Sequence, residues 1–185
     1  MIRGESIHLT PLDRTNAERV RAWINDPEVN QYLLTGQVPV TPEQEAAFYE
    51  RAEKDWNEGT GYIFEIHAEG VEGLIGHCGL HKVDMRHRSA ELGIFIGVLD
   101  QQNKGRGRDA IMTLVRFGFD TLGLNRIEIR SQADNDRGMH LYPKLGFTPV
   151  GRLREATYTH GNFQDEAIFD MLESEWRALR DGAGS

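Results

Sequence analysis

The chain opens with alternating apolar and polar positions. In residues 7–12, Ile7 and Leu9 fall on one side of an extended chain, and His8 and Thr10 fall on the other. A repeat of two is typical of a strand with one buried face. We therefore expect the first element to be a strand of a sheet.

Two helical patterns follow. Residues 16–25 repeat their apolar positions at helical spacing and stop before an Asp-Pro pair, which disfavours helix. Residues 41–57 begin with Thr41 as a cap and Gln44 three positions later, the spacing of a capping box. Residues 29–40 between them are rich in turn formers and are expected to be a loop. The expected apolar face of the second helix consists of Phe48, Ala52 and Trp56.

Three strand patterns then come in succession, which predicts an antiparallel meander over residues 62–68, 74–83 and 90–96. A glycine-bearing turn and a helix to about residue 122 come next, followed by a strand over residues 125–132. The apolar side of that helix is expected to hold Ala110, Ile111, Leu114 and Val115.

The last third predicts a short helix and a closing hairpin. Asn135 is the expected cap of the helix, which ends before Gly146. Pro143 cannot donate a backbone hydrogen bond, so the helix should end or distort at Tyr142. The hairpin and the final helix are predicted over residues 147–158, 162–172 and 173–180, with a turn at His160 and Gly161.

These elements predict an α/β fold whose mixed, mainly antiparallel sheet has about seven strands flanked by helices. A chain of 185 residues is most simply one domain, with a core over about residues 5–178. No apolar run approaches the length of a membrane span, and no signal peptide is evident. The single cysteine, Cys78, excludes an internal disulfide and favours the cytoplasm.

The formal net charge of -8 argues against a nucleic-acid partner, because a binder of nucleic acid would have to present a concentrated basic face. The local basic cluster of Lys104, Arg106 and Arg108 lies in the glycine turn, where a cofactor would account for it. An acidic surface elsewhere would attract a cationic substrate, or it could serve only to keep the protein in solution. The sequence leaves both interpretations of the acidic surface open.

The glycine turn has the chemistry of an anion site. It follows the apolar run of residues 94–98 and leads directly into a helix, and Gly105 and Gly107 allow close approach of a ligand to the backbone. Unpaired N–H groups at a helix start, together with the helix dipole, bind phosphate oxygens. We expect a pyrophosphate to lie there.

The spacing Gln102-x-x-Gly105-x-Gly107 resembles the signature of the GNAT superfamily of acetyl-CoA-dependent N-acetyltransferases. A second block, running from Asn135 through Tyr142 to Phe147, is similar to another segment of that family at the usual distance downstream. The two ends of the chain resemble the RimJ/RimL and spermidine acetyltransferase branch. The resemblance covers nearly the whole chain and implies the GNAT acyl-CoA N-acyltransferase fold.

The resemblance implies acetyl-CoA as acetyl donor, with the backbone of β-strand residues 95–97 splayed from its neighbour to meet the pantetheine. The implied cofactor-binding residues are Phe95, Ile96, Gly97, Gln102, Asn103, Lys104, Gly105, Arg106, Gly107, Arg108, Asn135 and Tyr142. Tyr142 is the implied acid, because a phenol with a pKa of about 10 can give a proton to a leaving thiolate.

Glu91 is the implied base and an acceptor contact, acting directly or through water. The resemblance also places the segment after the first helix beside the acceptor amine, which points to Glu28, Asn30, Gln31 and Tyr32. Glu65, His67, His77 and His81 are weaker candidates for the same cleft. The acceptor is expected to be a polyamine, a protein N-terminus, a lysine or a drug-like amine, and the protein a monomer or homodimer.

The sequence also allows three alternatives to an acetyltransferase site to be weighed. Gly105-x-Gly107-x-x-Ala110 also fits a dinucleotide fingerprint, with Glu128 as ribose partner. A domain of this family could also bind acetyl-CoA as a sensor without chemistry. A zinc site at His77, Cys78 and His81 is disfavoured, because a strand points Cys78 away from both histidines. We expect no metal.

Overall fold

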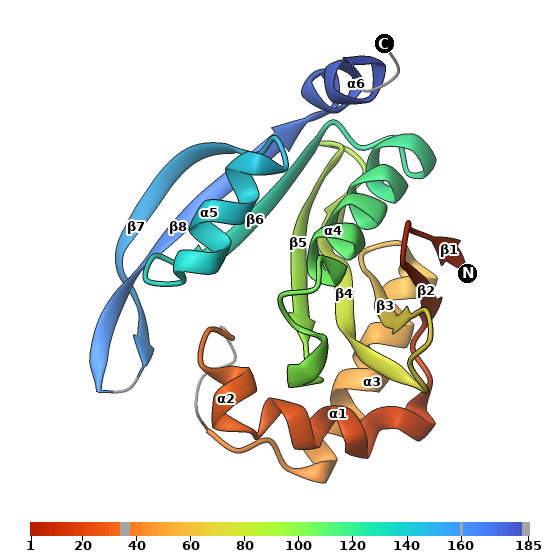
Figure 1. Ribbon diagram of the computed structural model, residues 1–185, viewed down its shortest axis with the longest axis vertical. Helices are drawn as coiled ribbons and strands as arrows, with labels where there is room; N and C mark the ends of the chain where they lie inside the picture. Colours follow the sequence, from red (N-terminus) through yellow and green to blue (C-terminus); the bar gives the residue numbers. More distant parts are fainter. Residues whose placement is uncertain (34–37, 160, 183–185) are drawn as a thin grey trace.

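The chain folds around one mixed sheet covered by helices. The computed structural model describes residues 1–33, 38–159 and 161–182 and is shown in Figure 1. The strands are β1 (Ile2–Arg3), β2 (Ile7–Pro11), β3 (Tyr62–Ala68), β4 (Leu74–Asp84), β5 (Ser89–Ile96), β6 (Arg126–Gln132), β7 (Thr148–Thr159) and β8 (Asn162–Leu172). The helices are α1 (Ala17–Ile24), α2 (Pro27–Asn30), α3 (Pro42–Glu58), α4 (Arg106–Arg116), α5 (Asp136–Lys144) and α6 (Glu173–Gly182). A π-helical turn, Phe117–Thr121, extends α4.

The sheet order over the described residues is β1-β2-β3-β4-β5-β6-β8-β7. Every neighbouring pair is antiparallel except β5 and β6, which are parallel and are joined through α4. The predicted mixed, mainly antiparallel sheet is therefore confirmed. The eighth strand is β1, whose two residues are too few to form a readable pattern. None of the helices in the described part of the chain has the length and hydropathy that a membrane span requires.

Helix α4 supplies the core of one sheet face. Its four predicted apolar residues, Ala110, Ile111, Leu114 and Val115, are each at most 1% exposed. The π-helical turn packs equally closely, since a Cβ at Gly118 would lie 2.7 Å from Ile127 Cδ1. Each fully buried Leu or Ile side chain stabilises the fold by about 1.5–3 kcal/mol. This packing fixes the start of α4 against β5.

Helix α3 covers part of the opposite face. Of the expected face, Ala52 is buried and Trp56 packs against Tyr62 and Phe64, whereas Phe48 is only half-buried and the remaining buried residues are Glu45 and Tyr49. The Tyr49 ring lies 6.3 Å from the ring of His77, on β4. Because α3 also approaches the sheet with two polar side chains, apolar spacing alone identified only part of its buried side.

The α3 capping box gives a test of local stability. The Thr41 hydroxyl accepts from the Gln44 N–H at 3.2 Å, and the Gln44 side chain accepts from the Thr41 N–H at 2.9 Å. We expect Thr41→Ala to lower the free energy of unfolding by about 1 kcal/mol. Thr41→Ser keeps the hydroxyl and should unfold at the wild-type urea midpoint. Equal urea midpoints for all three proteins would contradict a stabilising cap.

Helix α5 runs through its proline. It was expected to end or distort at Tyr142, but it continues to Lys144 with Pro143 inside. The Leu145 N–H bonds to the Leu141 carbonyl at 3.1 Å, and the Phe147 N–H bonds to the Tyr142 carbonyl at 3.1 Å. Pro143 lies in the last turn, so the helix loses one donor there and keeps the bonds that close its end.

The closing hairpin β7–β8 matches the prediction to within one residue. Its predicted turn includes His160, which lies outside the described residues, as do residues 34–37 of the predicted loop. The loop prediction also missed α2, a single turn in which the Asp26 side chain accepts from the Glu28 N–H.

Candidate active site

Strands β5 and β6 pair over only half of their length. Their parallel register runs from Ser89 opposite Arg126 to Leu92 opposite Ile129. Beyond these residues each strand keeps only its other neighbour, and the two diverge toward α2 (Figure 1). The opening leads into a cavity of about 650 Å³ walled by both strands, the first turn of α4, α5 and the α2 segment.

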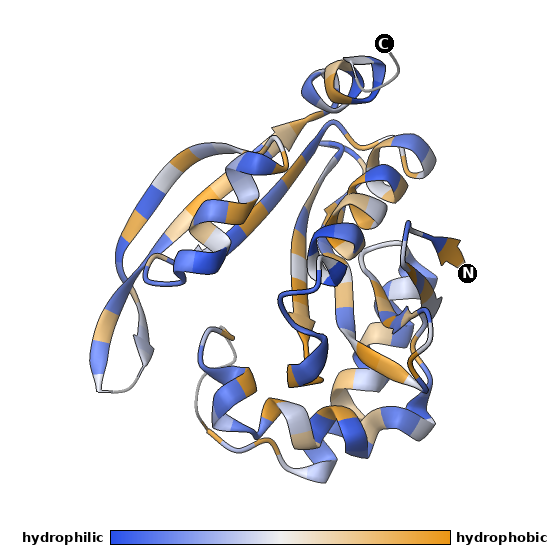
Figure 2. Cartoon of the chain, in the orientation of Figure 1, coloured by the Kyte–Doolittle hydropathy of each residue, from blue (hydrophilic) through white to orange (hydrophobic). Residues whose placement is uncertain are grey.

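The first turn of α4 presents backbone N–H groups to this cavity. Gly105 is the N-cap with φ of 79°, a left-handed conformation that suits glycine. The Asp109 N–H makes the first bond of the helix, to the Gly105 carbonyl at 3.0 Å. The N–H groups of residues 106–108 therefore have no partner within the helix, and Gly107 and Arg108 line the cavity. Figure 2 shows the turn as a hydrophilic stretch beside the apolar strand β5.

The predicted cations of this turn are not equivalent. Arg108 lines the cavity, whereas Lys104 and Arg106 are not among its lining residues. The Arg106 guanidinium bonds instead to the side chain of Gln101. Three cavity-lining residues that the sequence reasoning missed are Arg137, His140 and Lys144 of α5. Their shared helical face was a signal in the sequence, but nothing there showed that this face meets the cavity.

Gln102 and Asn103 line the cavity and connect its two sides. The Gln102 side chain donates to the Ile96 carbonyl at 2.9 Å and accepts from Arg137 at 3.0 Å. Arg137 also lies 3.4 Å from the Asn103 side-chain oxygen. These bonds tie the end of β5 and the glycine turn to α5.

The backbone N–H groups of β5 that face the gap are not all the predicted ones. The Gly97 N–H, expected to meet the pantetheine, bonds to the Ile75 carbonyl of β4 at 2.8 Å. Backbone groups of successive strand residues point to opposite edges, so Phe95 also turns its N–H toward β4. Ile94 and Ile96 turn theirs toward the gap. The amides of Phe95 and Gly97 thus face β4 and not the gap, which corrects their predicted orientation, whereas those of Ile94 and Ile96 face the gap, and Phe95 lines the cavity.

Tyr142 lines the cavity from α5, and its side chain is buried. Burial raises the pKa of its hydroxyl, which a hydrogen bond with Ser131 partly opposes, so the phenol is protonated at neutral pH. Gly138 leaves room for it, because a Cβ there would lie 3.1 Å from the hydroxyl oxygen. Pro143, the next residue, does not remove Tyr142 from the cavity.

Asn135 lines the cavity as the cap of α5. Its side-chain oxygen accepts from the Gly138 N–H at 3.2 Å, as the sequence predicted, and its amide donates to the Ser131 hydroxyl at 2.9 Å. Both polar ends of Asn135 therefore have partners within the protein. Asn135, Ser131 and Tyr142 form one connected polar wall.

On the α2 side, Glu28, Gln31 and Tyr32 line the cavity, as expected for acceptor contacts. Asn30 does not. Its side-chain amide donates to the Ile24 carbonyl at 2.9 Å and closes the turn between α1 and α2. The prediction that Asn30 contacts the acceptor is corrected to a structural role.

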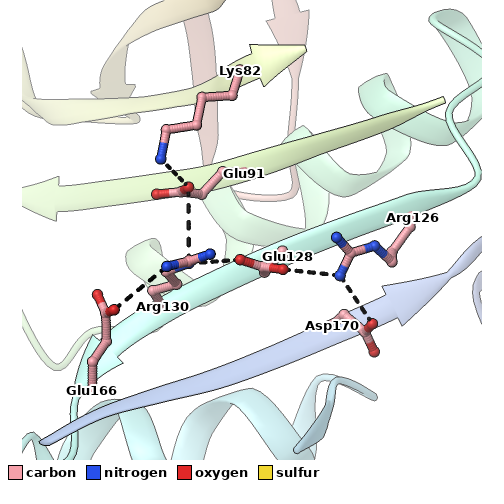
Figure 3. Close-up of polar contacts among 7 residues, drawn as sticks. All are labelled: Lys82, Glu91, Arg126, Glu128, Arg130, Glu166 and Asp170. Atoms are coloured by element: carbon pink, nitrogen blue, oxygen red, sulfur yellow. Dashed lines mark hydrogen bonds and ion pairs between the residues drawn. The ribbon is translucent and has the colours of Figure 1, made fainter. Parts of the chain in front are cut away.

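Glu91 belongs to a charged network on the open face of β5, β6 and β8 (Figure 3). Its carboxylate lies 2.7 Å from Lys82 Nζ and 4.0 Å from Arg130 Nε. It is not among the cavity-lining residues, whereas Arg130 is. A carboxylate held between two cations is poorly placed to take a proton, so these ion pairs argue against Glu91 as the base.

The structure also bears on the dinucleotide, cysteine and metal alternatives. Glu128, the expected ribose partner, bonds to Arg126 and Arg130 on the open sheet face, and the sheet is not the parallel one that the dinucleotide fold requires. Cys78 is buried at 2% exposure, and burial raises the pKa of its thiol, which disfavours a nucleophilic role. The described residues hold no group of three or more metal-ligating side chains.

The sequence matches the family described as the Acetyltransferase (GNAT) domain over residues 6–148. An uncharacterized N-acetyltransferase, p20 of Bacillus licheniformis, is 28% identical over 173 residues, which cover 93% of this chain and 96% of the relative.

Two solved structures share the architecture. The spermidine N-acetyltransferase of Vibrio cholerae, in complex with CoA and spermine, aligns with a TM-score of 0.82 at 25% identity and covers 93% of this chain and 98% of its own. A dodecameric structure of spermidine N-acetyltransferase from the same organism, in an intermediate state, aligns with a TM-score of 0.76 at 26% identity and covers 92% and 96%.

Proposed function

This chain belongs to the GNAT acetyltransferase family, and from that premise we propose that it acetylates a primary amine of a polyamine such as spermidine or spermine. It is an N-acetyltransferase, and its acetyl donor is acetyl-CoA. This identity sets aside the dinucleotide-binding and sensor alternatives. The acceptor is the part that the proposal adds.

One observation carries the choice of acceptor: through Arg130 the cavity borders a network of ion pairs in which carboxylates outnumber cations. Arg130 lines the cavity and lies 2.6 Å from Glu128 and 3.6 Å from Glu166. The network in Figure 3 contains four carboxylates against three cations. The carboxylates are Glu91, Glu128, Glu166 and Asp170, and the cations are Lys82, Arg126 and Arg130.

Negative charge on the acceptor side attracts a chain of ammonium groups more strongly than a single one. Glu28 adds a further carboxylate at the α2 wall of the cavity. The similarity to a spermidine N-acetyltransferase solved with spermine agrees with this choice. Glu91 is proposed here as part of the acceptor surface.

The residues proposed to hold acetyl-CoA follow from the cavity walls. The N–H groups of residues 106–108 would bind the pyrophosphate, with Arg108 beside them. The gap-facing amides of Ile94 and Ile96 would bind the pantetheine, and the Asn135 wall would contact its far side. Bound there, acetyl-CoA supplies the activated acetyl thioester. Tyr142 would donate its proton to the departing sulfur.

We further propose that residues 5–178 act as one domain, because β8 and β7 continue the same sheet to which β1 to β6 belong. Assembly as a monomer or homodimer stays a prediction beside the dodecamer reported for the relative.

The acceptor is tested by measuring CoA thiol release from acetyl-CoA with a panel of amines. We expect kcat/KM for spermidine and spermine to exceed that for butylamine by at least about 10-fold, and the advantage to shrink between 50 and 500 mM salt as charges are screened. Lysine and basic peptides serve as competing acceptors. Preferred acetylation of a peptide, or equal rates for butylamine and spermidine, would overturn the polyamine assignment.

A further inference from the structure

The imidazole of His81 packs against Gly93, a residue without a side chain beside the cavity. His81 lies on β4 directly opposite Glu91 of β5. A Cβ at Gly93, two residues further along β5, would lie 3.2 Å from His81 Nε2 and 3.4 Å from Cδ2. The ring therefore leans along the sheet over the glycine backbone.

Gly93 marks the point where the sheet opens. It is the first residue of β5 beyond the last pair with β6, Leu92 opposite Ile129, and it lines the cavity. His81 shares the sheet face of Glu91, because paired residues point the same way. The imidazole is not itself a lining residue of the cavity, but it lies against Gly93, which lines the cavity where the gap begins.

Tyr142 approaches from the other sheet face. Its ring lies 5.4 Å from Phe169, which pairs with Ile129, and Ile129 is the partner of Leu92. Leu92 is adjacent to Glu91 and so points to the opposite side of β5. The two proton-carrying side chains therefore lie on opposite faces of the sheet, with His81 on the face of Glu91 and Tyr142 on the face covered by α4 and α5.

The surroundings of His81 keep the ring neutral at pH 7, with burial as the main cause. Burial lowers its pKa below the ordinary value, and Lys82 of β4 acts in the same direction. Glu91 of β5 and Asp55 of α3 oppose this less strongly. Arg130 of β6 lies 4.0 Å from Glu91 and adds positive charge to the same face. A neutral imidazole has a lone pair with which to accept a proton.

We propose that His81 is the catalytic base that takes the proton of the attacking amine, an inference that rests on the proposed function. The amine nitrogen bonds to the acetyl carbon and passes a proton to His81 as the carbon–sulfur bond breaks. Tyr142 gives its proton to the departing sulfur. Solvent then carries the proton from His81 to the Tyr142 oxygen, so that both groups return to their starting states.

The test replaces His81 by glutamine and by alanine and measures spermidine acetylation against pH. We expect kcat to fall by roughly 100-fold in both variants, and the acid limb of wild-type kcat/KM, which lies below about pH 6.5, to disappear. Added imidazole should restore part of the rate of His81→Ala, in proportion to its neutral fraction. Acetyl-CoA affinity, measured by calorimetry, should stay within about 2-fold of wild type because the cofactor walls are untouched.

Two further variants separate chemistry from structure. His87→Gln removes an exposed histidine of the same hairpin, bonded to Asp84 at 2.8 Å, and should leave the pH profile unchanged. Gly93→Ala keeps His81 but displaces its ring, and should lower kcat more than it changes KM. This variant decides the matter if His81 variants do not fold.

The outcomes distinguish the two proposals. A wild-type protein that acetylates no polyamine overturns the proposed acceptor. If the wild type is active while His81→Gln keeps its acid limb and a kcat within about 3-fold of wild type, His81 is not the base. An unchanged rate in a folded Gly93→Ala protein would count equally against it.

Discussion

Replacing Tyr142 with phenylalanine is expected to lower kcat for acetyl transfer by about 100-fold while acetyl-CoA binds with unchanged affinity. The hydroxyl is buried against the cavity wall formed by Ser131 and Gly138, and its raised pKa keeps the proton in place at neutral pH. Removing the oxygen leaves the ring packing on Phe147 and Phe169 intact. The loss should therefore appear in chemistry and not in folding.

Single-turnover rates and calorimetric titration with acetyl-CoA check this prediction together. Tyr158→Phe is the matched control, because the Tyr158 side chain lies on β7 at 63% exposure. A Tyr142→Phe protein that loses acetyl-CoA binding, yet turns over at the wild-type rate once saturated, would show that the hydroxyl binds the cofactor and does not protonate the sulfur.

Local signals in the sequence predicted the elements that local forces build. The capping box of Thr41 and Gln44 and the Asn135 cap each depend on side chains within three residues, and each forms as expected. The buried side of α4 follows from a helical repeat that a large apolar core enforces. Such features are decided by neighbours along the chain.

The errors arose where a distant segment decides the outcome. The buried side of α3 carries Glu45 and Tyr49, which only its packing on the sheet reveals. Gly97 directs its N–H to Ile75 because of strand register, which the sequence does not specify. The Asn30 side-chain amide donates to the Ile24 carbonyl, whereas the sequence was equally consistent with a contact to the acceptor or with exposure to solvent.

The site itself was predictable in part. The glycine turn and Tyr142 stand out by spacing and line one cavity. The sequence did not identify the proposed base. It favoured the carboxylate of Glu91, because it does not show that Lys82 and Arg130 lie beside that carboxylate in the fold. His81 was one of several polar strand residues, and only the cross-strand geometry at Gly93 distinguished it.

Placing valine at Gly107 is expected to abolish acetyl-CoA binding without unfolding the protein. Among the described residues, a Cβ at this position meets Ile96 Cγ1 alone, at 4.0 Å, so the protein accommodates the side chain. The branched carbons would instead fill the cavity at the N–H groups that receive the pyrophosphate. Valine also has a higher helix propensity than glycine, so stability should not fall.

We expect the dissociation constant for acetyl-CoA to rise by at least about 100-fold, which corresponds to about 2.7 kcal/mol of lost binding free energy. Calorimetry measures the affinity, and thermal unfolding shows that the fold is retained. Gly151→Val is the control, since a Cβ at Gly151 on the exposed strand β7 has no atom of the described part of the chain within 4 Å. Gly151 also lies far from the turn in sequence and sheet order. Undiminished affinity in a folded Gly107→Val protein would place the pyrophosphate elsewhere, because no ligand could approach those backbone donors past an isopropyl group.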